Sequence, residues 1–394
     1  MPENNFETPL LSPNSPLDDH SKALIKEIYE KEQAKAMVLP TDDPLDPKRR
    51  ARVDFTWTEM QEQPDLLLQN IIVSKDTLLE IADYIASQDI NRIYMTGCGD
   101  STAAMLAVRA FLEQLLGIQC EVIQALDFTY YYHRPVDEHT LVITLSSSGN
   151  TVRTVEAMLI ARAKGAKTLC LSNTPGSPLM VESTRSILIH AERKGWPTQS
   201  STAAMMILYQ LGLRIAEKFG RNNDLVNHYQ NALLRIPDMV RRVLENQNDL
   251  MIEISQSEAE KRIYLFAGGG PAYASTLIGA AKVKECTPDH AIAIPLEEFH
   301  HYNSQKAGDP LFLTVPDGPS IPRALDTARE GRRWNGKIYS IISENNHLFD
   351  EVSNNTIVMP QIDEYLSPLV YTIPLQQFAY HVAIHKFNLA EKQE

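Results

Sequence analysis

The stretch from Leu141 to Thr154, which reads LVITLSSSGNTVRT, most constrains what this chain can fold into. It begins with a short apolar, β-branched run, which is typical of a strand buried in a parallel sheet. A turn of serine, glycine, asparagine and threonine follows, and then a helical pattern over 152–163. Free N–H groups at a helix start bind anions, and the hydroxyl groups add neutral donors. The stretch therefore predicts a phosphate site, although serine and threonine also cap ordinary helices.

The same order of strand, turn and helix recurs along the first half of the chain. Strands are expected at 92–96, 120–123, 141–145, 168–171 and 187–189. Because helical segments separate them, we expect an α/β fold with a parallel sheet covered on both faces. Ligands of such sheets bind beyond the carboxyl ends of the strands. Three hydroxyl-rich turns are expected at that edge, at 97–102, 146–151 and 198–202.

The second half of the chain repeats this pattern. A strand at 262–267, a Gly-Gly-Gly-Pro turn and a helix at 272–285 echo residues 92–116. Further strands are expected at 311–315, 337–342 and 356–359. We therefore expect two copies of one fold, of which only the first carries the serine cluster. The expected domains are an N-terminal arm at 1–55 with a disordered start, a first domain at 56–228 and a second at 229–394. Helices are expected at 22–36 in the arm, at 58–69 before the first strand and at 225–247 between the two copies.

Composition restricts the partners and the compartment. The 394 residues carry a formal net charge of −13, which disfavours nucleic acid and anionic membranes as main partners. The four cysteines are scattered without a CxxC pair, as in a reducing compartment. Without a secretory signal or a long apolar run, the chain is expected to be cytoplasmic, and no metal site is visible. The Gly-x-Gly at 97–99 lacks the third glycine of a dinucleotide fingerprint, so no NAD or other cofactor is expected.

Four motifs together resemble the double sugar-isomerase (SIS) domain family over roughly residues 55–388. They are GCGDS at 97–101, SSSGNT at 146–151, KVKE at 282–285 and VYTIPLQQFAYH at 370–381. The resemblance implies two tandem SIS domains, each a flavodoxin-like parallel sheet between helices. It implies that the 6-phosphate of a sugar is held by Ser101, Ser146, Ser147, Ser148 and Thr151. It also implies further substrate contacts from Gly99, Asp100, Ser200 and Ser201.

The same resemblance places the catalytic groups in the second domain. It assigns a catalytic glutamate to Glu285 and a ring-opening histidine to His301, with His300 as the rival. Moving a carbonyl between C1 and C2 of an open-chain sugar needs a carboxylate that takes a proton from one carbon and returns it to the next. Without the resemblance, a solvated helix end and a surface histidine would be the simpler interpretation. Because the family's histidine reaches the partner subunit, the resemblance also implies a homodimer with shared active sites.

The departures from the family affect the expected substrate. Only about 55 residues precede the first repeat, so no glutaminase activity is expected. Asp100, Ser147 and Asn150 replace residues of the family's synthases, which puts the sugar and the amine in question but leaves the phosphate anchor. The expected function is a fructosamine-6-phosphate-type deglycase. The alternatives are a glucosamine-6-phosphate deaminase or isomerase, a plain aldose–ketose phosphosugar isomerase, and a non-catalytic phosphosugar sensor.

Overall fold

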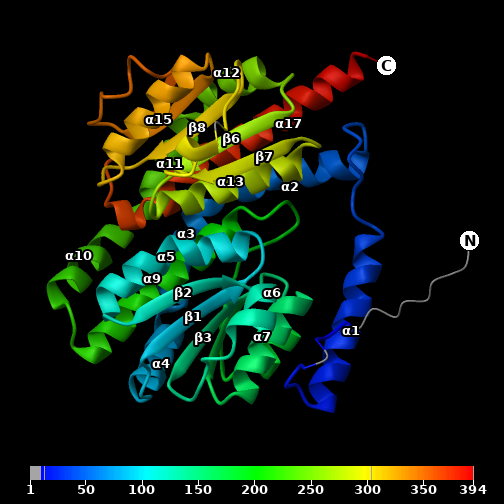
Figure 1. Ribbon diagram of the computed structural model, residues 1–394, viewed down its shortest axis with the longest axis vertical. Helices are drawn as coiled ribbons and strands as arrows, with labels where there is room; N and C mark the ends of the chain where they lie inside the picture. The colour runs from blue at the N-terminus through cyan, green and yellow to red at the C-terminus, as the bar shows by residue number, and fades with distance from the viewer. Residues whose placement is uncertain (1–9, 13, 303, 394) are drawn as a thin grey trace, which may run out of the picture. The chain divides into compact units, whose positions relative to one another are not determined.

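Two five-stranded parallel sheets form the frame of the protein (Figure 1). The computed structural model describes residues 10–12, 14–302 and 304–393. The first sheet has the order β2-β1-β3-β4-β5, with β1 Arg92–Gly97, β2 Gln119–Gln124, β3 Thr140–Leu145, β4 Lys167–Ser172 and β5 Arg185–Leu188. The second has the order β10-β9-β8-β6-β7, with β6 Ile263–Gly268, β7 His290–Pro295, β8 Pro310–Val315, β9 Lys337–Ser343 and β10 Asn355–Met359.

Strand order confirms the expected repeat. Reading the second sheet from β7 gives β7-β6-β8-β9-β10, which is the order of the first sheet with each number raised by five. Neighbouring strands such as β1 and β3, or β6 and β8, pair in parallel. The two-copy α/β architecture expected from the sequence is therefore present, because each copy places its first and third strands side by side at the centre.

The helices fall between and around these strands. The helices up to residue 219 are α1 Asp19–Ala36, α2 Pro47–Gln61, α3 Gln63–Val73, α4 Lys75–Ala86, α5 Asp100–Leu116, α6 Ala125–Asp127, the π-helix η1 Phe128–Tyr132, α7 Val152–Ala163, α8 Pro178–Glu182 and α9 Gln199–Phe219. The remaining ones are α10 Asn223–Leu233, α11 Ile236–Asn246, α12 Asn248–Glu258, α13 Ala272–Cys286, α14 Phe299–Tyr302, α15 Ile321–Arg333, the 3-10 helix η2 Glu364–Leu366, α16 Pro368–Tyr371 and α17 Ile373–Glu391.

Contacts divide the chain into two compact units that are not continuous in sequence. The first contains Gln88–Cys98, Glu121–Leu188 and the described residues up to Leu39. The second contains Pro40–Ser87, Gly99–Cys120 and the described residues from Ile189 onward. The domain limits expected from the sequence follow the repeat and not these units, and they remain a prediction.

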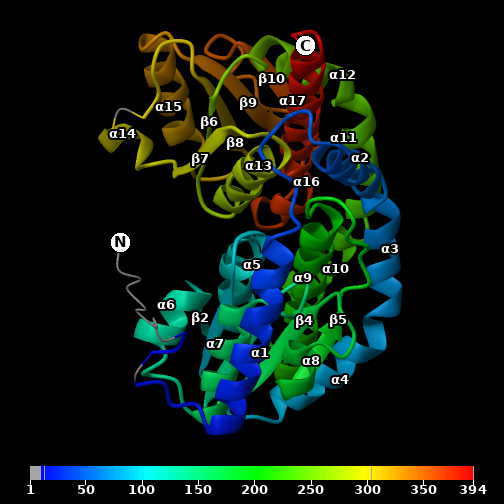
Figure 2. The same ribbon diagram turned by 90° about the vertical axis from the view of Figure 1, so that its right-hand side faces the viewer.

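In the first unit, α7 packs on β1, β3 and β4, and α1 lies along α7 (Figure 2). Ile25 and Ile28 of α1 are buried in one cluster with Val155 and Met158 of α7. Burial of each isoleucine contributes roughly 1.5–3 kcal/mol. The helix expected at 22–36 in the N-terminal arm is thus observed, as α1, and it supplies part of a hydrophobic core. The disordered start expected before this helix lies partly in residues 1–9 and 13, which are outside the described residues, and it stays a prediction.

In the second unit, α13 packs against β6, β7 and β8 and also against α5 and α17. The inner faces of these strands form a core with α15, to which Leu265, Leu313 and Ala328 contribute. The helix α5 packs on α9 as well as on α13. The first turn of α5 and the last turn of α13 carry residues predicted for the site.

Two helical predictions were wrong in their boundaries. The helix expected at 58–69 is divided between α2 and α3, and the segment expected at 225–247 is divided between α10 and α11. In each case the later helix has a proline in its first turn, Pro64 in α3 and Pro237 in α11. Proline lacks the N–H that would continue the preceding helix, so it fits the first turn of a new one.

Candidate functional site

The serine turn between β3 and α7 has the geometry of an anion site. The Ser146 hydroxyl lies 3.0 Å from that of Thr151 and 3.5 Å from that of Ser148. Thr151 is the N-cap residue of α7, and its side chain caps none of the N–H groups of the first helical turn. Those N–H groups have no intrahelical acceptor, so they can donate to a bound anion. The structure therefore brings Ser146, Ser148 and Thr151 together at a helix N-terminus.

Ser147 has a different position from the other serines of the turn. Its Oγ accepts a hydrogen bond from Asn173 Nδ2 at 2.8 Å, and its carbonyl oxygen accepts one from the Ser172 hydroxyl at 3.3 Å. These bonds tie the turn to the end of β4. The Ser147 hydroxyl can still donate its own proton, so its assignment to phosphate binding stays a prediction.

Gly149 allows the turn to close. Its φ is +62°, a conformation that side chains with a Cβ rarely adopt. A Cβ at this position would also collide with the side chain of Ser177. The Gly149 N–H donates to Ser146 Oγ at 3.1 Å, which fixes that hydroxyl in place. The glycine of the motif is therefore required by the backbone and by its close approach to a neighbouring side chain.

The turn after β1 starts beside the serine turn. Gly97 of β1 pairs with Leu145 of β3, so the two turns leave the sheet from adjacent positions. Gly99 has φ +57° and is the residue before α5, whose first two residues are Asp100 and Ser101. The strand register thus brings the starts of the two motifs to neighbouring positions at one edge of the sheet.

A charged network surrounds Glu285 in the second unit. Lys282 and Glu285 are three residues apart on α13, and their ammonium and carboxylate groups are in contact. The same ammonium lies 2.6 Å from Asp100 Oδ2, and Lys282 is buried to 1% exposure. Residues three apart share one face of a helix, which explains how one lysine contacts both Glu285 and α5. The structure therefore brings Asp100 and Glu285 together through a lysine to which the sequence had given no role.

Ser201 joins this network from α9, and Ser200 precedes it in the same helical turn. The sequence predicted a turn ending at these serines, but both belong to the first turn of α9 and are buried. The Ser201 hydroxyl donates to Asp100 Oδ2 at 3.4 Å. Asp100 is thus held by a serine and a lysine from two other helices. The prediction that Ser200 and Ser201 lie in a turn was wrong, because both are helical.

Burial and the neighbouring charges set the proton affinities of this network. Burial raises the pKa of Glu285, the Lys282 ammonium opposes this, and the Asp100 carboxylate adds to it. Burial alone would lower the pKa of Lys282, but the two carboxylates outweigh burial and leave it raised. A lysine that stays charged beside a glutamate of raised pKa can help that carboxyl to accept and return a proton.

Arginines lie at the end of α13 next to Glu285. Arg49 Nη1 donates to the Glu285 carbonyl oxygen at 3.2 Å, near the C-terminus of the helix. A cation there satisfies a free carbonyl and complements the helix dipole. The guanidinium of Arg52 lies over the ring of Trp196, at 3.6 Å from its centroid. The Arg49 bond holds the backbone at Glu285, and the charge of Arg52 lowers the pKa of the Glu285 carboxyl, against the effect of burial.

The two neighbouring histidines differ in their surroundings. His300 Nδ1 lies 2.7 Å from Glu330 Oε2, and its Nε2 lies 2.8 Å from the Thr327 hydroxyl. His301 is exposed on α14, with Nε2 3.6 Å from Glu297 Oε1. Both ring nitrogens of His300 are therefore occupied by α15, whereas His301 is exposed. The choice of His301 over His300 stays a prediction, and this contrast favours it.

Lys282 is the functional candidate that sequence reasoning missed. It stood inside the KVKE motif at 282–285, but only the glutamate was given a role. A signal was present, because Lys282 follows Gly279, Ala280 and Ala281 on the same helix. A lysine inside a small and apolar stretch of helix is rarely fully buried unless it is paired.

Comparisons with known proteins define the class of this chain. Residues 87–214 match the SIS domain family. The C-terminal domain of glucosamine-fructose-6-phosphate aminotransferase from Francisella tularensis matches 84% of this chain and 96% of its own, with a TM-score of 0.75 and 25% identity. The chain therefore contains a SIS domain and is homologous to that C-terminal domain, which confirms the resemblance expected from the motifs.

Relatives in sequence point the same way. Glutamine–fructose-6-phosphate aminotransferase (isomerizing) from Thermococcus kodakarensis is 29% identical over 86% of this chain and 56% of its own length. The Shewanella oneidensis protein of the same description is 30% identical over 84% and 56%. This chain thus spans little more than half the length of the curated relatives it matches. Tagatose-6-phosphate ketose/aldose isomerase from Escherichia coli shares the fold, with a TM-score of 0.67 at 16% identity over 84% of this chain and 93% of its own.

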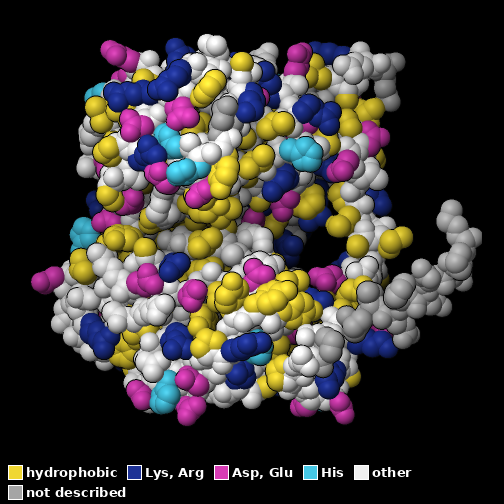
Figure 3. Space-filling model, viewed as in Figure 1, with side chains coloured by type: hydrophobic (Ala, Val, Ile, Leu, Met, Phe, Trp, Pro, Cys, Tyr) yellow, Lys and Arg dark blue, Asp and Glu magenta, His cyan; other side chains and the backbone are white. Residues whose placement is uncertain are grey.

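Further features of the described residues concern binding of other kinds. None of the described helices combines the length and the hydropathy that a membrane span needs. Within the described part of the chain, no three His, Cys, Asp or Glu side chains gather as metal ligands. On the face shown in Figure 3, lysines and arginines alternate with acidic side chains and do not form one basic surface.

Proposed function

We propose that this chain is an enzyme that enolises a 6-phosphorylated sugar at C1 and C2, and that its preferred reaction is deglycation of a fructosamine 6-phosphate. The observation that carries the proposal is the contact between Glu285 and the buried ammonium of Lys282, on a helix end where the family resemblance expects a catalytic carboxylate. The serine turn at 146–151, with its converging hydroxyls, would bind the phosphate.

Glu285 would move one proton between two carbons. As a carboxylate it would take a proton from C1 of the open-chain ketoamine, which gives a 1,2-enaminol. It would then return the proton to C2, which leaves an imine at C1. Water adds to that carbon and the amine leaves, so the products are an aldose 6-phosphate and a free amine. The balance needs only water, and His301 would transfer the protons that open the sugar ring.

Asp100 supports an amine-bearing substrate over a plain ketose. Its contacts with Lys282 and Ser201 both use Oδ2. A carboxylate held in this way can offer its other oxygen to an ammonium group, and a neutral sugar hydroxyl gains less from a charged acceptor. This supports the deglycase over the aldose–ketose isomerase.

The test is product release by the purified protein. We would offer fructosamine 6-phosphates, glucosamine 6-phosphate and fructose 6-phosphate, and assay free amine and aldose 6-phosphate. The proposal expects turnover of the fructosamine compounds that Glu285→Gln abolishes. Turnover of glucosamine 6-phosphate alone would identify a deaminase, and interconversion of hexose phosphates alone an isomerase. Binding without any turnover would identify a sensor and refute the enzyme.

We also propose that His301 acts in the site of a partner subunit in a homodimer. Its exposure on α14 supports this proposal. Glu285→Gln and His301→Ala chains would each be inactive alone. Mixed and refolded together, they would recover roughly a quarter of wild-type activity, because half the dimers are mixed and each has one complete site. A mixture that stays inactive would contradict the shared site.

A further inference from the structure

Arg52 lies on α2 one helical turn after Arg49, which donates to the Glu285 carbonyl oxygen at 3.2 Å. Residues three apart share one face of a helix, so Arg52 lies on the face of α2 that meets the end of α13. Val53 of α2 and Cys286 of α13 are buried in one hydrophobic cluster at this junction. The charges of Arg52 and Glu285 act on each other, since each shifts the pKa of the other. Arg52 therefore belongs to the surroundings of the proposed catalytic carboxylate.

The guanidinium of Arg52 is held flat on an aromatic ring. It lies over Trp196, at 3.6 Å from the ring centroid. The segment before α9 that carries this ring is fixed on α2 itself. The Trp196 N–H donates to Thr56 Oγ1 at 2.7 Å, and the Gly195 N–H donates to Glu59 Oε1 at 3.0 Å. A guanidinium that is stacked by its face keeps the N–H donors of its edge for a planar acceptor.

Arg52 has no hydrogen-bond or ion-pair partner among the residues that the structure describes. It is half-buried, and burial together with the neighbouring charge of Arg193 lowers its pKa. The carboxylates of Glu285 and Glu59 oppose this effect, but neither forms an ion pair with Arg52. A half-buried cation next to a second cation is unfavourable unless an anion joins them. Arg52 and the exposed Arg193 thus indicate an anionic guest.

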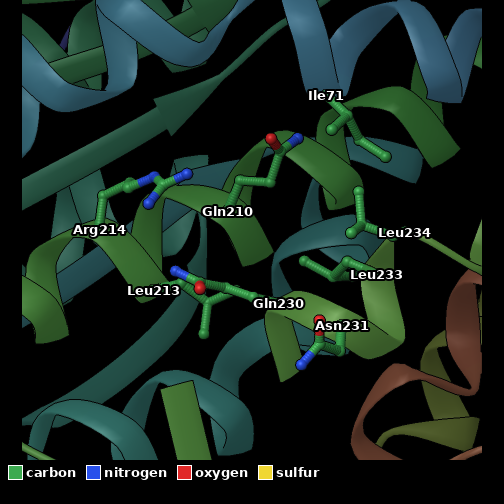
Figure 4. A pocket seen from close by; sticks show the side chains of 8 residues that line it. All are labelled: Ile71, Gln210, Leu213, Arg214, Gln230, Asn231, Leu233 and Leu234. Atoms are coloured by element: carbon green, nitrogen blue, oxygen red, sulfur yellow. The ribbon is translucent and has the colours of Figure 1, made fainter. Parts of the chain in front are cut away.

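Other arginines of the same unit show what distinguishes Arg52. Arg49 Nη2 pairs with Asp42 Oδ1 at 2.8 Å. Arg214 lines a hollow of about 210 Å³ between α3, α9 and α10, whose lining residues Figure 4 shows. It is paired with Glu217 at 2.8 Å. The charges of these two arginines are balanced within the protein, whereas the charge of Arg52 has no ion-pair partner in the described part of the chain.

We propose that Arg52 is a specificity residue that binds a carboxylate on the amine portion of the substrate, with Arg193 adding to the attraction. The inference rests on the proposed function and names its substrate class, which is ketoamines whose nitrogen belongs to an amino acid. That nitrogen is bonded to C1, the carbon from which Glu285 would take a proton, so its substituent extends from C1 into the surroundings of Glu285. The 6-phosphate is at the opposite end of the sugar. The carboxylate would form the bidentate pair that a guanidinium prefers.

The test compares two ketoamine 6-phosphates that have nearly the same shape and differ in one charge. One is the adduct of glycine, and the other is the adduct of glycinamide, in which an amide replaces the carboxylate. For the wild type, kcat/KM for the glycine adduct should exceed that for the glycinamide adduct roughly 10- to 100-fold, the strength of a hydrogen bond to a charged group. The difference should lie mainly in KM, because the contact is made in the ground state as well as in the transition state.

Arg52→Gln should remove this preference and leave similar kcat/KM values for the two adducts. Its effect on the pKa of the proposed catalytic carboxylate is common to both adducts and cancels in their ratio. Arg50→Gln is the matched control, because Arg50 belongs to the same helix and also lies over an aromatic ring, that of Phe387. Arg50 is paired with Glu391, and its variant should keep the preference of the wild type.

Arg193→Gln keeps the test valid if Arg52→Gln fails to fold, because Arg193 is exposed. It should reduce the preference for the glycine adduct roughly two- to fivefold, and an unchanged preference in both arginine variants would overturn the inference. Equal turnover of the two adducts by the wild type would also overturn it and leave the deglycase in place. If the wild type turns over neither adduct, the proposed function fails and this inference fails with it.

Discussion

Replacing Lys282 by methionine tests the charged network at its centre. The ammonium contacts Glu285 and lies 2.6 Å from Asp100 Oδ2, with the lysine only 1% exposed. An opposite charge at such a distance lowers the pKa of a carboxyl by about 1–3 units. Lys282→Met should therefore raise the pKa of Glu285 further by about that amount. The variant keeps the approximate volume of the side chain, so packing is largely maintained.

The assay is kcat/KM against pH for the wild type and the variant. A general base must be deprotonated, so activity rises as the pH passes the pKa of Glu285. In Lys282→Met this acid limb should move to higher pH by about 1–3 units, which lowers the rate roughly 10- to 1000-fold below it. An acid limb that stays in place or moves to lower pH, in a folded variant, would refute the reasoning.

Two companion variants control the sign and the site. Lys284→Met removes an exposed lysine of the same helix and should leave the limb where it is. Asp100→Asn removes the carboxylate that raises the pKa of Glu285, so its limb should move to lower pH. Urea unfolding completes the comparison, because removing one partner of a buried ion pair costs about 3–5 kcal/mol. Lys284→Met should cost under about 0.5 kcal/mol.

Three other predictions concern stability and the phosphate turn. Burial lowers the pKa of His381 to about 4 from 6.5, so the free energy of unfolding should fall by about 3 kcal/mol as the pH drops from 6.5 to 4. His381→Gln should flatten this pH dependence in urea titrations. An unchanged slope would show that His381 is not the group responsible. Gly149→Ala should abolish phosphate binding in calorimetry, because its φ is +62° and a Cβ would strike Ser177; retained affinity would show that the turn adapts. Ile25→Ala should cost about 2–5 kcal/mol in chemical unfolding if α1 is part of the core, and a loss below 1 kcal/mol would show that α1 detaches freely.

The sequence predicted nine of the ten described strands because their signals are local, and it missed β7 His290–Pro295, an edge strand in which buried and exposed residues are mixed. The run at 141–145 predicted β3, which the structure extends by one residue to Thr140–Leu145. Buried parallel strands are short and continuously apolar, so few alternatives compete with them. Helix limits were less certain, because the prolines at Pro64 and Pro237 could be read as interior positions when they begin new helices.

The clustering of hydroxyls in the serine turn could also be predicted, since these residues are close in sequence and one turn brings them together; phosphate binding there stays a prediction. The network around Glu285 could not. Asp100 and Lys282 are 182 positions apart, and only the packing of α5 on α13 places them 2.6 Å from each other. Long-range pairs of this kind depend on tertiary packing. Hydrophobic periodicity predicts helices and strands, but it does not show which of them pack together.

The two copies of the fold differ at the turn that we propose binds phosphate. The strand β8 corresponds to β3 in sheet order, so the turn at Gly318 corresponds to the serine turn. There the carboxylate of Glu364 lies so close to Gly318 that a Cβ on the glycine would collide with it. Burial and the neighbouring Asp363 raise the pKa of Glu364. A phosphate at this turn would meet a like charge at short range, at a cost that grows as the surroundings become less polar. The second copy therefore holds a carboxylate of its own at the turn that corresponds to the serine turn, which disfavours a phosphate site there.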